Sequence, residues 1–268
     1  MTIARRLLGD RWRGVRGWAL GTVASVATVV ALWPSVRGNL DIERVVQDLP
    51  ASVRVLIGSQ PDIPLGSAAG YLQARLFSTI LPILFLIYGI GLGAAAIGGA
   101  EEDGTLQLVV TAPVSRTRVA AERLGASLLL LVGLAGLGLL TTVLLGLPAG
   151  VFDEVSVSRV ALATAAVTAL AVLHATVAFT AGAVTGRRGT AIAVASSVAV
   201  GGYLLHAVAA SAEVIRPLRA VSPWWWLLDR NLLVQPPTVL ALWLPILLSA
   251  ILVVVAMLAF DRRDLRFP

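Results

Sequence analysis

The sequence predicts an all-α membrane protein with six transmembrane helices. Of its 268 residues, 57% are hydrophobic and only 13% are charged, with a mean hydropathy of +0.87, whereas soluble domains carry about a quarter charged residues. Six apolar stretches each come close to the ~20 residues that a helix needs to cross the hydrocarbon core. They span residues 17–33, 77–97, 124–147, 160–184, 190–210 and 239–260, and we treat 1–268 as a single transmembrane domain.

The positive charges are all Arg, because the chain has no Lys, and they give a net charge of +6. A P-loop needs Lys on the nucleotide phosphates and a Schiff base needs a Lys amine, so both kinds of site are excluded. Cys is also absent, which excludes disulfides and thiolate metal sites. The Arg residues cluster beside the apolar stretches instead of lining one soluble face, which argues against a nucleic-acid partner.

The first element expected is an amphipathic helix over residues 1–16. Leu8, Trp12 and Val15 fall on one helical face and Arg5 and Arg13 on the other. This pattern is typical of a helix lying on the inner leaflet, with Trp12 at headgroup depth and Arg facing anionic lipid. The alternative is an ordinary positively charged flank. Trp33-Pro34, not a small-residue cleavage site, ends the first apolar stretch, which favours a retained span over a signal peptide.

Orientation follows from the distribution of Arg. If both termini are cytoplasmic, thirteen of the 21 Arg lie on the cytoplasmic side, and this excess predicts that orientation. Residues 34–76 and 211–238 are then external. The first should hold short amphipathic helices broken by proline. The second contains Trp224, Trp225 and Trp226, which we expect at the membrane interface, with ligand stacking as the alternative.

The most informative connection is the predicted cytoplasmic loop over residues 98–123. Its acidic residues end the second helix in water, Gly104 allows a sharp turn, and Thr105 can cap a new short helix. Leu106 gives that helix an apolar face, Pro113 stops it, and Arg116 leads back to the membrane. An apolar face on the cytoplasmic side needs a partner surface. The alternative is a solvated linker.

This loop, with Glu101-Glu102 before Gly104-Thr105-Leu106 and then Pro113-Val114-Ser115-Arg116, resembles the first cytoplasmic loop of ABC-2-type transporter permeases. Leu49–Gly58, Gly70-Tyr71-Leu72 and Ser222-Pro223 extend the resemblance over the chain. It implies a prokaryotic plasma-membrane exporter subunit that pairs with a second permease copy, as a homodimer, and with a separate ATPase that binds ATP and Mg. This chain would need no cofactor. The coupling contact would consist of Glu101, Glu102, Gly104, Thr105, Leu106, Pro113 and Arg116, with Leu106 inserted into a groove of the ATPase.

Candidate catalytic residues are few. The two histidines, His174 and His206, both lie in apolar stretches, and Ser196-Ser197 with His206 is the nearest approach to a nucleophile and base. Such histidines are typical of hydrogen-bonded residues inside helical bundles. No charged group lies inside a predicted span, which argues against a secondary transporter. An ATP-driven exporter of a hydrophobic or amphipathic cargo is therefore favoured. An intramembrane enzyme and a non-transporting membrane anchor are the alternatives.

Overall fold

A computed structural model of the chain describes residues 12–38, 45–46, 48–50, 53–54, 63–106, 115–209, 212–228, 231–235 and 239–263. Within these ranges the protein is helical and has no strand. Six helices are long and apolar enough to cross a membrane, as the six apolar stretches predicted. The fold class is therefore confirmed as an all-α, multi-pass membrane architecture.

The six spans follow one another along the chain. The first is α2 (Trp12–Val36), and the second is a composite of α5 (Ala68–Leu72), η1 (Gln73–Ile80), α6 (Leu81–Ala94), η2 (Ala95–Gly99) and α7 (Ala100–Glu102). The remaining four are α9 (Arg116–Gly146), α10 (Val157–Thr185), α11 (Arg188–Ala209) and α13 (Val239–Arg262). Between them lie the short helices η3 (Val151–Asp153), η4 (Glu213–Val221) and α12 (Pro223–Leu228).

The second span is interrupted by two π-helical segments, η1 and η2, one on each side of α6. A π-turn replaces the i→i+4 hydrogen bonds of the α-helix by i→i+5 bonds. In η1 the Thr79 hydroxyl donates to the Ala74 carbonyl at 2.9 Å. Pro82 follows at the start of α6, where its missing N–H is tolerated.

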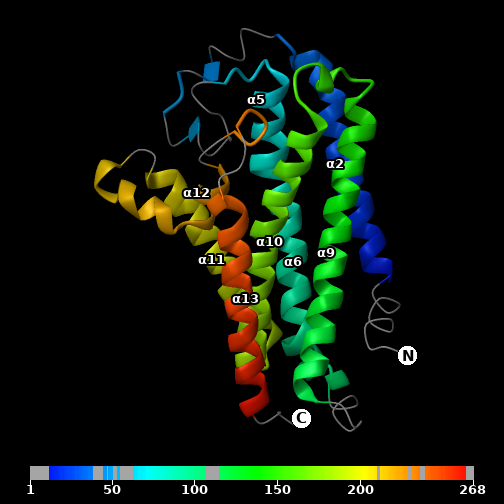
Figure 1. The fold of residues 1–268 in the computed structure, drawn as a ribbon, viewed down its shortest axis with the longest axis vertical. Helices are drawn as coiled ribbons and strands as arrows, with labels where there is room; N and C mark the ends of the chain where they lie inside the picture. Colours follow the sequence, from blue (N-terminus) through cyan, green and yellow to red (C-terminus); the bar gives the residue numbers. More distant parts are fainter. Residues whose placement is uncertain are drawn as a thin grey trace.

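Helix α10 lies at the centre of the bundle and contacts α6, α9, α11 and α13 (Figure 1). Its closest approach is to α6, through small residues. A Cβ at Gly89 would lie 3.2 Å from the Ala171 carbonyl oxygen, and one at Gly93 would overlap the Ala175 carbonyl. Small residues therefore permit the close helix packing expected in membranes.

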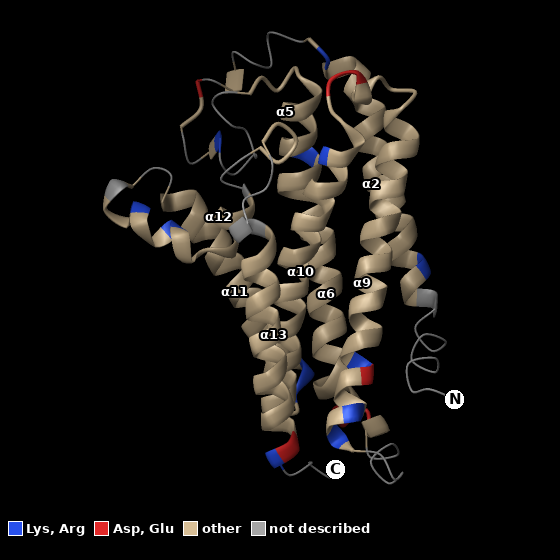
Figure 2. Cartoon of the chain, in the orientation of Figure 1, with Lys and Arg blue, Asp and Glu red and all other residues tan. Residues whose placement is uncertain are grey.

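Charged side chains gather toward the two ends of the bundle, and its middle is almost free of them (Figure 2). The start of α2, the start of α9 and the end of α13 lie toward the same end (Figure 1). An even number of spans requires this arrangement. We call this end, with residues 98–106, 115–123, 185–188 and 261–263, the charged end.

The helices extend beyond the apolar stretches that predicted them. Residues 12–16 begin α2 and are continuous with the first span, while residues 1–11 of the expected surface helix lie outside the described residues. Residues 34–36 and 68–76, which were expected in an external segment, are helical parts of the first two spans. Hydropathy detects only the apolar core of a span, whereas helical hydrogen bonding continues through polar flanks.

Candidate functional site

The turn after the second span has the conformation that its glycine predicts. Gly104 has φ +68°, in the left-handed region that glycine adopts without steric cost. The Asp103 N–H donates to the Gly99 carbonyl and the Gly104 N–H to the Glu101 carbonyl, at 2.9 and 3.1 Å. These bonds end the helix at Asp103 and turn the chain, so the sharp turn predicted at Gly104 is confirmed.

Glu101 forms an ion pair within the chain. Its carboxylate accepts a hydrogen bond from the Arg263 guanidinium, although the two residues are 162 positions apart. The Glu101 side chain is 4% exposed and that of Arg263 is 17% exposed. The end of the second span is therefore held to the end of α13 by a buried ion pair. Glu101 was expected to face basic groups on a partner, and this carboxylate instead has a partner in its own chain.

The turn between α10 and α11 lies against this ion pair. Gly186 has φ +68° and ends α10 as a left-handed cap. A Cβ at this position would overlap the Arg263 guanidinium and lie 2.8 Å from both Glu101 carboxylate oxygens. Gly186 therefore serves two purposes, because it allows the backbone turn and leaves space for the charged pair.

Two more hydrogen bonds extend the ion pair into a junction. The Arg188 N–H at the start of α11 donates to Glu102 Oε1 at 3.1 Å. Arg116 Nη1 at the start of α9 donates to the Arg263 carbonyl at 2.8 Å. The charged junction, which we define as Glu101, Glu102, Arg116, Gly186 and Arg263 with the Arg188 backbone, thus joins α7, α9, α13 and the α10–α11 turn.

Leu106 lies inside the chain and not on its surface. Its side chain is fully buried and belongs to a cluster with Ile97, Val119, Phe179 and Phe260. The expectation that Leu106 inserts into a partner is therefore wrong for this structure, because no surface of its side chain is exposed. The amphipathic pattern correctly predicted an apolar contact, but helices of the same chain supply it. Leu106 anchors the base of the loop.

The remaining loop residues divide between described and undescribed parts. The Thr105 hydroxyl donates to the Ala100 carbonyl at 3.2 Å. Pro113 lies outside the described residues, as does all of 107–114, where the short coupling helix was expected. The return to the membrane begins at Ser115, whose hydroxyl accepts a hydrogen bond from the Arg118 N–H at 3.3 Å and caps α9.

Arg123 is a buried residue that the sequence suggested was only a flanking charge. It is 4% exposed, and its Nη1 donates to the Ala96 carbonyl at 3.2 Å. Ala96 lies in the π-helical segment η2. Arg123 therefore joins α9 to the second span through a contact that no local pattern in the sequence reveals.

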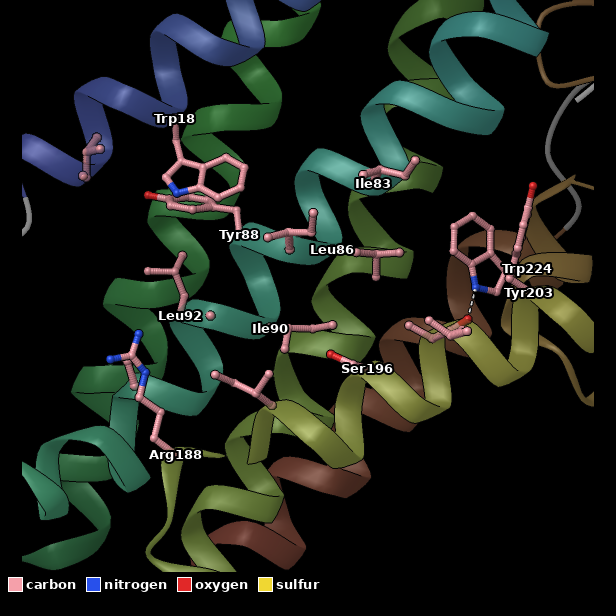
Figure 3. Close-up of a pocket in the computed structure, with 18 of the residues that line it drawn as sticks. Trp18, Ile83, Leu86, Tyr88, Ile90, Leu92, Arg188, Ser196, Tyr203 and Trp224 are labelled. Atoms are coloured by element: carbon pink, nitrogen blue, oxygen red, sulfur yellow. Dashed lines mark hydrogen bonds between the residues drawn. The ribbon is translucent and has the colours of Figure 1, made fainter. Parts of the chain in front are cut away.

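A groove of about 910 Å³ runs along α6 between α2 and α11 (Figure 3). This volume lies in the upper part of the range found for small-molecule sites. Apolar and aromatic side chains line most of it, including Trp18, Ile83, Ile87, Ile192 and Val200. Polar groups lie at intervals along it, from Ser78 and Thr79 at one end to Asp103 and Arg188 at the charged end.

Aromatic contacts define two borders of the groove. The rings of Trp18 and Tyr88 lie 5.2 Å apart and join α2 to α6, whereas those of Tyr203 and Trp224 lie 4.8 Å apart. Trp224 is 5% exposed, and its indole donates to the Ala199 carbonyl at 2.8 Å (Figure 3). Trp224 therefore fixes α12 to α11 and faces the protein interior, whereas it was expected at the lipid interface.

Trp225 and Trp226, which follow Trp224, are only partly buried. The Trp225 ring lies 5.3 Å from the Arg219 guanidinium carbon, and the Trp226 indole donates to the Ala220 carbonyl at 2.7 Å. Both lie on α12, which the Ser222 hydroxyl also holds to α11 by donating to the Gly202 carbonyl at 2.7 Å. The three adjacent tryptophans thus contact different parts of the chain. Nothing is described for the side chain of Trp12.

The candidate catalytic residues are not brought together. Ser196 and His206 lie on the same helix, α11, and ten residues along an α-helix place them about 15 Å apart. A nucleophile and its base must lie within hydrogen-bond distance. His174 is fully buried in α10, with Nδ1 2.8 Å from the Leu170 carbonyl oxygen. Among the described residues, no group of three or more His, Cys, Asp or Glu could hold a metal ion.

Comparison with known proteins adds no family assignment. No protein-family model matches the chain, and no curated protein sequence matches it. The charged junction and the groove are therefore the features from which a function can be argued.

Proposed function

We propose that this chain is the membrane-spanning subunit of an ATP-driven exporter, whose energy comes from a separate ATPase bound at the charged end. The resemblance of residues 98–123 to the coupling loop of ABC-2-type permeases suggested this role. Six spans and a groove of suitable size for a hydrophobic or amphipathic cargo support it. In this proposal both termini and the charged end are cytoplasmic, in a prokaryotic plasma membrane.

The observation that carries the proposal is the charged junction. A loop that served only as a linker would need no connection to distant spans. Here the loop base is held to α13 by Glu101 and Arg263, to α11 by Glu102, and to the cluster around Leu106. A force on residues 107–114 would therefore reach four further spans, α9, α10, α11 and α13, through a few defined contacts.

A second copy of the chain completes the proposed transporter. The groove is open along one side, where Ile87 and Val200 remain more than half exposed. A second copy across this side would enclose a route between the two subunits. Gly91 of the second span and Gly201 of the fifth, where an added Cβ would meet open space, suit such a contact. Cross-linking in membranes should then detect a dimer.

The deciding experiment is recovery of an ATPase with the tagged full-length chain from its native membranes. We expect a P-loop ATPase to co-purify and its ATP hydrolysis to respond to cargo. The test variant is Val109→Asp, because Val109 follows Leu106 by three positions and the sequence pattern puts both on the same apolar face of the loop. The matched control is Val214→Asp, because Val214 is 93% exposed on η4, away from the charged end.

Val109→Asp should release the ATPase while the permease stays folded, as judged by unchanged size-exclusion and thermal unfolding profiles, and Val214→Asp should retain it. Retention of the ATPase by both variants would remove the loop as the docking site. If the chain retains a cytoplasmic protein but ATP drives no export, the alternative of a membrane anchor gains the support. An intramembrane enzyme is disfavoured by the separation of Ser196 from His206 on α11.

A further inference from the structure

The groove along α6 has different chemistry at its two ends and in its middle. Ser78 and Ala95 both line it and are 17 positions apart along the second span, which corresponds to roughly 25 Å of helix. This is most of the ~30 Å hydrocarbon thickness of a bilayer. The groove is thus long enough to follow an extended apolar chain through most of one membrane.

Among the described residues that line this groove, the charged side chains are at one end. Asp103 and Arg188 both line it there and come from different spans. Figure 3 shows the Arg188 side chain extending along the groove toward Leu92. Among the described residues, neither side chain forms an ion pair. The Arg188 backbone is fixed by Glu102, which leaves its guanidinium available to a ligand.

The middle of the groove is apolar and accessible from the side. Ile83, Ile87 and Val200 are between 49% and 58% exposed there, so an apolar chain could lie against them from the surrounding lipid. The charged groups at one end of the groove and its apolar middle together match a molecule with a dipolar headgroup and a hydrocarbon tail. A phosphate can accept hydrogen bonds from Arg188, and an ammonium group can pair with the carboxylate of Asp103. A purely apolar cargo would leave both charges unused.

We infer that the groove binds a dipolar amphiphile of the phosphatidylethanolamine type, with its phosphate on Arg188, its ammonium on Asp103 and one acyl chain along Ile87 and Ile83. This inference names the cargo class of the proposed exporter and rests on that proposed function. The amphiphile enters from the leaflet at the charged end. Its head stays beside the charged junction, where Glu102 holds the Arg188 backbone.

Native mass spectrometry of the purified full-length chain with added lipid tests the inference. The probes are phosphatidylethanolamine, phosphatidylglycerol and diacylglycerol with identical acyl chains. Arg188→Gln should weaken phosphatidylethanolamine binding about tenfold, the loss expected for one charge-assisted hydrogen bond, and leave diacylglycerol unchanged. Asp103→Asn should raise the affinity for phosphatidylglycerol relative to phosphatidylethanolamine, because it removes a repulsive carboxylate.

Matched controls separate a site from general surface charge. Arg187→Gln changes a neighbouring exposed arginine that does not line the groove, and it should have no effect. Ile87→Trp should block all three probes by filling the groove, whereas Leu129→Trp, at a 71% exposed position of α9, should block none. Equal effects of Arg187→Gln and Arg188→Gln, or a wild-type preference for phosphatidylglycerol, would overturn the headgroup assignment.

The binding measurement needs no ATPase, so the two proposals fail separately. ATP-driven export without lipid binding in the groove would overturn the amphiphile inference and leave the exporter. Lipid binding with the expected variant pattern, in a chain that no ATPase accompanies, would support the binding site and refute its use for export.

Discussion

Replacing Arg263 by Ala should destabilise the protein far more than replacing its neighbour Arg262. Arg263 forms the ion pair with Glu101, whose side chain is only 4% exposed. Arg262 is exposed at the end of α13. Removing one member of a buried pair leaves the other charge uncompensated, at about 3–5 kcal/mol. Because Arg263 retains 17% exposure, we take the lower value, about 3 kcal/mol.

Thermal unfolding of the purified protein measures this difference. For a chain of this size 1 kcal/mol corresponds to about 2–4 °C in Tm, so Arg263→Ala should lower Tm by about 6–12 °C. Arg262→Ala should shift Tm by no more than about 2 °C, as for a surface substitution. Glu101→Gln in the Arg263→Ala background should recover much of the loss, because no buried charge then remains unpaired.

The double-mutant cycle isolates the interaction. With Glu101→Gln and Arg263→Ala measured singly and together, the coupling energy should reach about 2 kcal/mol, within the range for residues in direct contact. A coupling energy under about 0.5 kcal/mol, or equal Tm shifts for Arg262→Ala and Arg263→Ala, would refute the reasoning that this pair holds α13 to the second span.

Three further results are expected. Gly186→Ala should destabilise the protein by about 1–2 kcal/mol through its left-handed backbone alone, and by more because the added Cβ displaces the ion pair. The Tm of the control Gly189→Ala, where a Cβ meets open space, should stay close to that of the wild type. Leu106→Asp should lower Tm even without any partner, because a charge enters an apolar cluster at a cost of a few kcal/mol; an unchanged Tm would contradict the burial of Leu106. In intact cells, an impermeant thiol reagent should label the Ser156→Cys variant but not the Arg187→Cys variant. The reverse pattern would invert the proposed orientation. The labelling is specific because the native chain has no Cys.

The sequence predicted those features that depend on local chemistry. The six spans follow from runs of apolar residues that only lipid can solvate, and the turn at Gly104 follows from the freedom of glycine at positive φ. The second span also contains Gly89 and Gly93, which allow its close packing against α10. In each case the signal lies within a few residues of its structural consequence.

The features that could not be predicted depend on contacts between distant residues. Glu101 and Arg263 are 162 positions apart, and nothing near Glu101 indicates which arginine it meets. The apolar pattern at Leu106 predicted burial correctly, but it could not show that α9, α10 and α13 of the same chain supply the contact. Arg123 was similarly indistinguishable from a flanking charge, because its acceptor, the Ala96 carbonyl, lies 27 positions away in the sequence.

The π-helical segments also determine which deletions the second span should tolerate. Each residue of an α-helix advances the chain by about 100°, so deleting one residue from regular helix rotates everything beyond it by that angle. A deletion within α6 would therefore turn Glu101 away from Arg263. A π-turn already holds one residue more than an α-turn, so deleting one residue within η2 can restore α-helix and keep Glu101 in phase with Gly89 and Gly93. The angle by which Glu101 is rotated about the helix axis relative to Gly89 and Gly93 therefore matters more than the number of residues between them.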